Sequence, residues 1–173
     1  MHPQTNNLAF RRFKLSDLDS FHETQLTCQL PRRHPYKQGI SESASKFLEA
    51  LQQSEDKCRY WALEEAVSGV FLGYCKLCRN SKDEIEIDYD LLGSAKKLGF
   101  EKVILSFLAC YAFSQLKQQS VNCTANKKNG ILLHALEELG FQQTAAVSSS
   151  GNETLLRYKL NKSTFIELAE QFQ

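Results

Sequence analysis

The sequence has little of several features that would assign a protein to a specialised class. Its 173 residues carry 20 acidic and 21 basic side chains, a formal net charge of +1, whereas nucleic-acid-binding proteins carry a clear basic excess. No apolar run approaches the roughly 20 residues that span a bilayer. Residues 1–9 lack the basic and then apolar layout of a secretion signal. We therefore expect no nucleic-acid partner, no membrane partner and a cytoplasmic location.

The composition and length are those of an ordinary globular protein. Hydrophobic residues make up 42% and charged residues 24% of the chain, which is typical of soluble proteins. The length favours a single domain over residues 1–173, which can fold without metals or disulfides. The six cysteines are expected to be reduced thiols, because no export signal is seen. Cys75 and Cys78 would point to opposite faces of a strand, so we predict no metal site.

Patterns of apolar residues predict an α+β fold with a mixed sheet of about seven strands flanked by helices. Ser16 is expected to cap the first helix through its hydroxyl, and Gly140 suits the left-handed position after a helix. A long helix between two strands implies a parallel crossover. The predicted strands are 8–13, 59–64, 70–78, 84–92, 120–125, 141–147 and 154–160. The predicted helices are 17–26, 41–53, 99–116, 129–139 and, at the C-terminus, 163–171.

The fourth predicted strand holds the densest charge. A period of two puts its acidic residues on one face and its apolar residues on the other. The acids are Glu84, Glu86, Asp88 and Asp90, and the apolar residues are Ile85, Ile87, Tyr89 and Leu91. An acidic face attracts a cationic amine, and crowded like charges can raise the pKa of a carboxyl group toward the range of a general base. A solvated sheet face explains the same pattern.

An ordered set of five stretches also runs through the chain: Phe10–Asp17, Phe71–Tyr74, Glu86–Tyr89, Lys96–Glu101 and Asn129–Phe141. Together they resemble the GNAT superfamily of N-acetyltransferases, in particular its RimJ/RimL-like branch, which acetylates protein N-terminal amines. The fourth stretch lies where the family carries its acetyl-CoA signature, Q/R-x-x-G-x-G/A. The last resembles the closing helix with its terminal Leu-Gly-Phe. The resemblance covers about residues 8–160.

The resemblance implies acetyl transfer from acetyl-CoA, as co-substrate, to a primary amine, either a small molecule or a protein N-terminus. The base would be Glu86, or Glu84 or Asp88 beside it. Backbone amides and a helix N-terminus, which favours an anion in any protein, would hold the donor. The implied donor-binding residues are Leu91, Leu92, Lys96, Lys97, Leu98, Gly99, Phe100, Lys102 and Asn129. The protein is expected to be a monomer or a homodimer.

Three residues depart from the family pattern. Glu101 stands where the family has Gly or Ala, and its carboxylate would repel a pyrophosphate. Leu132 and Leu136 occupy the positions where Ser or Tyr would protonate the leaving thiolate, and His134 lies nearly opposite them. These departures favour a second interpretation, a catalytically inactive GNAT-like module for binding or interaction.

Two further readings of single features stay open. Asn129 matches a family position but suits an ordinary helix N-cap equally well. The basic loop 31–37 lies where the family covers its acceptor, although a solvated loop explains it too. An unrelated α+β fold would explain the composition but not the order of the five stretches.

Overall fold

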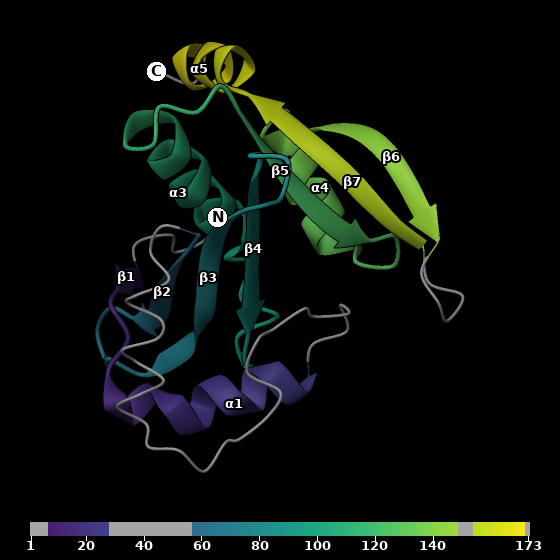
Figure 1. Cartoon of the computed structure of the whole chain (residues 1–173). Coiled ribbons are helices and arrows are strands. Elements are labelled where there is room, and N and C mark those ends of the chain that lie inside the picture. The colour runs from purple at the N-terminus through teal and green to yellow at the C-terminus, as the bar shows by residue number, and fades with distance from the viewer. Residues whose placement is uncertain (1–6, 28–56, 149–153, 172–173) are drawn as a thin grey trace. The chain divides into compact units, whose positions relative to one another are not determined.

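The computed structural model describes residues 7–27, 57–148 and 154–171 (Figure 1). The predicted helix 41–53, the basic loop 31–37 and Cys28 lie outside the described residues. Contacts within the chain divide it into two compact units, residues 1–76 with 89–98, and residues 77–88 with 99–173. None of the described helices is long and apolar enough to cross a membrane.

Seven strands form a mixed sheet in the order β1-β2-β3-β4-β5-β7-β6, which confirms the predicted α+β class. The strands are β1 (Leu8–Arg11), β2 (Cys58–Glu65), β3 (Phe71–Arg79), β4 (Ile85–Leu91), β5 (Ser120–Asn126), β6 (Gln142–Ser148) and β7 (Thr154–Asn161). The helices are η2 (Leu15–Asp17), α1 (Leu18–Thr27), α3 (Glu101–Ser114), α4 (Gly130–Glu138) and α5 (Lys162–Gln171). The described elements follow the predicted order, with ends within about two residues of those predicted.

The first unit is built on aromatic packing. β1 pairs antiparallel with β2, from Leu8 opposite Glu65 to Arg11 opposite Ala62. Phe21 of α1 lies with its ring centroid 4.9 Å from that of Tyr74 in β3, nearly edge to face, an arrangement that aromatic rings prefer. The buried cluster consists of Phe21, Ala62, Phe71 and Tyr74. This cluster fixes α1 against β2 and β3.

A buried carboxylate joins β1 to the start of α1. Asp17 is 3% exposed and receives hydrogen bonds from Arg11 Nη1 at 2.6 Å, from Arg11 Nη2 at 2.9 Å and from the Lys14 amide at 2.7 Å. Burial raises its pKa, but these bonds outweigh that effect and hold the pKa below the usual value. Ser16, which was predicted to cap the helix, lies within η2, and at the start of η2 the Asp17 carboxylate accepts from the Lys14 amide.

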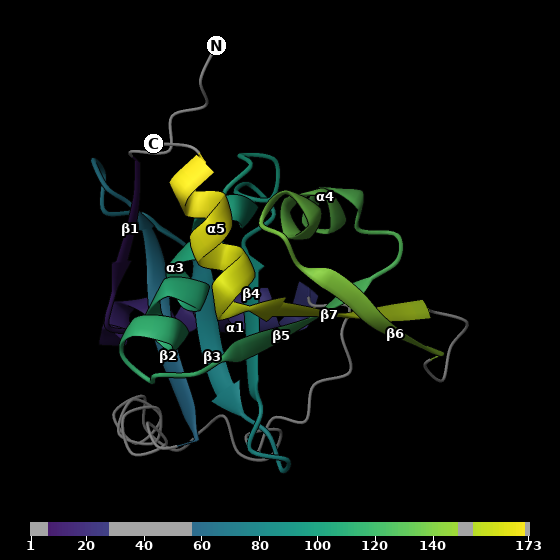
Figure 2. The same ribbon diagram turned by 90° about the horizontal axis from the view of Figure 1, so that it is seen from above.

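The second unit combines a parallel and an antiparallel strand pairing. β4 and β5 are parallel, with Glu86 opposite Asn122 and Ile87 opposite Cys123, and β7 lies antiparallel between β5 and β6. Helix α4 lies on one side of β5, β7 and β6 (Figure 2). The buried face of α3 consists of Ile104, Leu105, Leu108, Ala109, Ala112 and Phe113. The expectation that Cys110 belongs to this core was wrong, since its side chain is exposed.

Gly140, at the end of α4, lies against α5. It follows α4 with a φ of +80°, the left-handed region that glycine adopts without strain. A Cβ atom here would lie 2.6 Å from Leu168 Cδ1 and 3.0 Å from Thr164 Cγ2, both on α5. α5 also packs on α3, where the ring centroids of Phe113 and Phe165 are 5.6 Å apart. The helix is thus seated on the end of α4 and the side of α3.

The cysteines differ from expectation. Cys58 and Cys78 are disulfide-bonded, whereas Cys75, Cys110 and Cys123 are free thiols. We expected reduced thiols throughout, and Cys75 was the only partner that we considered for Cys78. Sheet formation brings together residues that are far apart in the sequence, so spacing along one strand could not decide this.

The Asp17 carboxylate should stabilise the protein in a pH-dependent way. Asp17→Asn removes the charge that pairs with Arg11 and should lower the free energy of unfolding at pH 7 by about 2 kcal/mol. Because the native pKa lies below the unfolded value, this contribution is present above about pH 4 and is lost as the pH falls through the native pKa. Urea unfolding at pH 7 and pH 3 measures it. Asp19→Asn, at an exposed carboxylate of the same helix, is the control; an equal effect would contradict the assignment.

Candidate active site

Three charged side chains meet on one face of the second unit. Arg157 of β7 lies with Nη2 2.9 Å from Glu84 Oε2 and 3.6 Å from Glu86 Oε1. The sheet register explains the reach, because Arg157 stands opposite Thr124 of β5 and Glu86 stands opposite Asn122 of the same strand. A hydrogen bond from the Asn80 side chain, together with the Arg157 charge, lowers the pKa of Glu84.

The acidic alternation of β4 stops before the strand ends. Half-buried Glu86 and Asp88 alternate with buried Ile85 and Ile87. The next two residues break this pattern, because Tyr89 is half-buried and Asp90 is only 7% exposed. Asp90 Oδ1 accepts a hydrogen bond from the Leu91 amide at 3.0 Å and lies 3.7 Å from Lys96 Nζ. Asp90 thus differs from Glu86 and Asp88 in being buried, and local partners hold its carboxylate.

The predicted amide donors at the end of β4 already have acceptors. The Leu91 amide donates to Asp90, and the Leu92 amide donates to the Leu72 carbonyl at 2.8 Å. Beyond them the chain turns, with the Ala95 and Lys96 amides both bonded to the Leu92 carbonyl, at 2.8 and 3.1 Å. A ligand at either strand-end amide would have to replace an acceptor that is present.

The predicted signature forms a turn that leads into α3. Lys97 and Leu98 are exposed, and Gly99 has a φ of +73°, so a residue without a side chain is needed there. Phe100 is the N-cap of α3 and provides no side-chain hydrogen bond to the helix. The first amides of α3 are therefore not capped by a side chain at this position, which leaves the positive end of the helix available to an anion.

Glu101 stands in the first turn of α3 and is buried. It is 6% exposed, and its Oε2 atom has no hydrogen-bond partner among the described residues. Burial raises its pKa, and only its own backbone amide acts in the opposite direction. A buried carboxyl group without a cation favours its neutral form. The residue that departs most from the family pattern thus lies inside the fold rather than in solvent.

The start of α4 holds the remaining predicted positions. Asn129 Oδ1 accepts a hydrogen bond from the Leu132 amide at 3.2 Å, so the asparagine caps this helix. Leu132 and Leu136 are 7% and 0% exposed and pack inside the fold. His134 is exposed and lies 3.9 Å from Glu138, on the polar face as predicted.

Two residues of this region escaped the sequence analysis. Arg157 gave no signal, because its partner Glu84 lies 73 positions away in the sequence. Asn126, at the end of β5, is 8% exposed; its Oδ1 accepts from the Lys128 amide at 2.9 Å, but its Nδ2 has no partner among the described residues. A buried amide donor without an acceptor is rare and costly.

The described residues contain no group of three or more His, Cys, Asp or Glu side chains that could hold a metal ion. The predicted residues instead form two groups, each within one unit. Asp90, Leu91, Leu92 and Lys96 meet at the end of β4 in the first unit. Glu84, Glu86 and the start of α3 belong to the second, where Lys102 pairs with Glu138 at 3.5 Å.

Comparison with known proteins bears on the fold and the family of this chain. Solved structures of the spermidine N-acetyltransferase SpeG from Vibrio cholerae are similar to this chain. A variant of that enzyme superimposes with a TM-score of 0.76 at 17% identity, over 95% of this chain and 99% of that one. A dodecameric form gives a TM-score of 0.75 at 17% identity, over 93% of this chain and 97% of the other.

A likeness at this level of identity shows a shared fold. A search of curated proteins found no match. Residues 7–142 match the family described as "Acetyltransferase (GNAT) domain", which is more than three quarters of the chain. The chain therefore belongs to the GNAT family of acetyltransferases.

Proposed function

We propose that this protein transfers an acetyl group from acetyl-CoA to a primary amine of a small molecule or of a protein N-terminus. The observation that carries the proposal is the start of α3, which follows left-handed Gly99 and has no side-chain cap at Phe100. A helix N-terminus favours an anion, because it has unpaired amides and the positive end of the helix dipole. Acetyl-CoA supplies the activated thioester.

The residues at α3 fit the donor in most respects. The helix amides offer hydrogen bonds to a phosphate, and Lys96 and Lys97, in the turn that leads into α3, add positive charge. The orphaned Asn126 Nδ2 is a buried donor that a ligand carbonyl would satisfy. Glu101 opposes an anion only when it is ionised, and burial favours its neutral form. We therefore assign the donor to this helix start, and the RimJ/RimL-like branch remains our finer proposal.

The acid–base chemistry is assigned to β4. Glu86 is half-buried and lies 3.6 Å from Arg157, and we assign it the role of accepting a proton from the attacking amine. Glu84 and Asp88 lie one strand period away and add negative charge that attracts a cationic acceptor. Leu132 and Leu136 offer no proton, so we assign protonation of the leaving thiolate to water.

The acceptor is a cationic amine in either form of the proposal. Solved relatives named for spermidine share the fold, and the acidic residues of β4 suit a polyamine or a protein N-terminus. A second candidate is supported by Glu101, Leu132 and Leu136, which replace residues that the family uses. In that case the protein would bind the donor without turnover.

Assays of binding and turnover separate these candidates. Acetyl-CoA at about 100 times its Kd should stabilise the protein by about 2.7 kcal/mol, measured as a rise in Tm. Release of CoA should then appear with spermidine or with a short peptide bearing a free N-terminus. A rise in Tm without acetylation of either acceptor would identify a binding module, and no rise at millimolar acetyl-CoA would sink the proposal.

Replacement of the proposed base should slow the reaction without changing the fold. Glu86→Gln keeps the shape of the side chain but removes the proton acceptor, and kcat should fall by about 10²-fold or more. The measurement is the rate from pH 6 to pH 9 with the best amine. Glu170→Gln, an exposed glutamate on α5, should leave the rate unchanged. A Glu86→Gln enzyme as fast as wild type would remove this residue from the mechanism.

The buried carboxyl at the start of α3 should destabilise the protein as the pH rises. The native pKa of Glu101 lies above the unfolded value, so the unfolded state ionises first and wild-type stability falls between those two pKa values. Glu101→Gln should be more stable than wild type at pH 8 by about 1 kcal/mol, with little difference at pH 4. Urea unfolding tests this, with exposed Glu167→Gln as control. A difference that does not grow with pH would contradict the buried state.

A further inference from the structure

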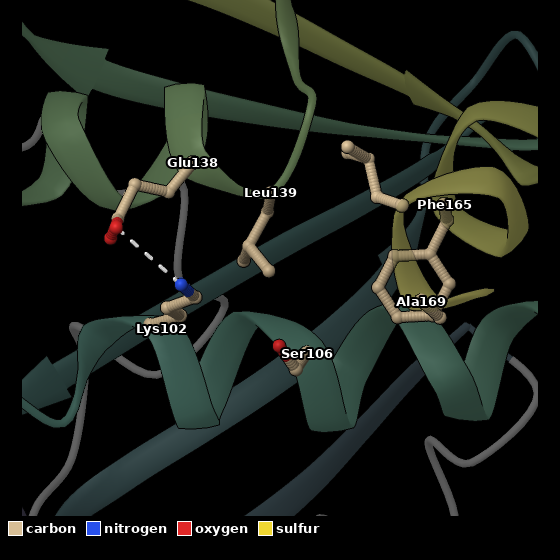
Figure 3. Close-up of a pocket in the computed structure, with 7 residues that line it drawn as sticks. Lys102, Ser106, Glu138, Leu139, Phe165 and Ala169 are labelled. Atoms are coloured by element: carbon tan, nitrogen blue, oxygen red, sulfur yellow. Dashed lines mark ion pairs between the residues drawn. The ribbon is translucent and has the colours of Figure 1, made fainter. Parts of the chain in front are cut away.

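A cavity of 360 Å³ opens among α3, α4 and α5 in the second unit. Figure 3 shows the Lys102–Glu138 ion pair at one end and side chains of α5 at the other. Protein sites for small molecules have volumes of about 300–1,000 Å³, so this cavity suits a small ligand. Of its lining residues, Lys102 also belongs to the implied donor-binding residues at the start of α3, whereas the others lie outside β4 and outside the residues where we placed the acetyl transfer.

The inner part of the cavity is apolar. Leu139, at the end of α4, is 8% exposed, and Phe165 and Leu168 of α5 line the opposite side. Two contacts hold α5 in this place, the ring contact of Phe165 with Phe113 and the close approach of Leu168 to Gly140. The wall is therefore part of the packed fold and would accept an aromatic or aliphatic body.

The polar end offers more hydrogen-bond donors than acceptors. Glu138 contributes a carboxylate, with Oε1 3.5 Å from Lys102 Nζ and Oε2 3.9 Å from His134 Nε2. The Lys102 ammonium carries three donors, and Glu138 is its ion-pair partner among the described residues. The side chain of Lys102 is 49% exposed, so the ammonium can still turn toward a ligand at the rim.

A second donor lies on the same face of α3. Ser106 lines the cavity and follows Lys102 by four residues, one turn of helix, so the two side chains lie next to each other. Figure 3 shows both side chains on the side of α3 that faces α4. An ammonium and a hydroxyl at this spacing suit an acceptor with two oxygen atoms.

We propose that this cavity binds a small amphipathic monocarboxylate, with its carboxylate on Lys102 and Ser106 and its apolar body against Leu139, Phe165 and Leu168. The ligand takes no part in acetyl transfer, and the cavity shares only Lys102 with the residues implied to bind the donor. A neutral analogue lacks the charge that Lys102 recognises.

Calorimetry with 4-phenylbutanoate tests the proposal on the full chain. Binding should be saturable and should weaken about tenfold in Lys102→Met, which removes the charge but keeps the aliphatic stem. The alcohol 4-phenylbutan-1-ol should bind wild type about as weakly as the acid binds that variant. Ala169→Trp, at an exposed lining position of α5, should fill the cavity and abolish binding without lowering Tm.

Lys82→Met, at an exposed turn away from the cavity, is the matched control and should bind 4-phenylbutanoate like wild type. The titration is repeated with saturating CoA, which should leave the affinity unchanged. Undetectable binding, equal affinity in Lys102→Met, or displacement of the acid by CoA would each overturn the proposal. Displacement would assign the cavity to the nucleotide of the donor.

Discussion

The parallel pairing of β4 with β5 is the constraint on which the rest of the structure depends. Parallel neighbours cannot be joined by a tight turn, so the chain must return along the sheet before β5 begins. α3 makes this return. α3 therefore begins only ten residues after β4 ends. The positive N-terminal end of the helix thus comes soon after the acidic strand in the chain. This short connection contains Gly99 and Phe100, the N-cap residue that gives α3 no side-chain hydrogen bond.

Three glutamates illustrate how the surroundings decide what a carboxyl group can do. Glu84 is held by Asn80 and Arg157, which lower its pKa, whereas burial raises the pKa of Glu101. Glu86 lies at 3.6 Å from the same arginine as Glu84. Identical side chains thus serve as an ion-pair partner, as a buried group that favours a proton, and as the proposed proton acceptor. Composition alone could not distinguish them.

The secondary structure could be predicted from the sequence because local periodicity decides it. The bounds of β5, Ser120–Asn126, and of α4, Gly130–Glu138, differ by one residue at most from those that the pattern of apolar residues indicated. The family was also accessible, since its five stretches occur in order along the chain. These features depend on neighbours within a few residues.

Features that depend on strand pairing could not be predicted in this way. Arg157 reaches Glu84 only because β7 enters the sheet beside β5. Asp90 and Asp17 are cases of another kind, because each is buried with a cation six residues away, Lys96 and Arg11. Strand pairing decided the first case, and side-chain placement, which periodicity does not give, decided the other two.

Gly140 carries two requirements that usually fall on different residues. Its left-handed backbone ends α4, and its missing side chain makes room for Leu168 and Thr164 of a helix that begins more than twenty residues later. Asparagine often replaces glycine where only the backbone matters, but its Cβ atom would meet α5. Descendants of this sequence could therefore exchange Gly140 for asparagine only after losing or shifting α5. The order of evolutionary change at Gly140 and at α5 is thus constrained.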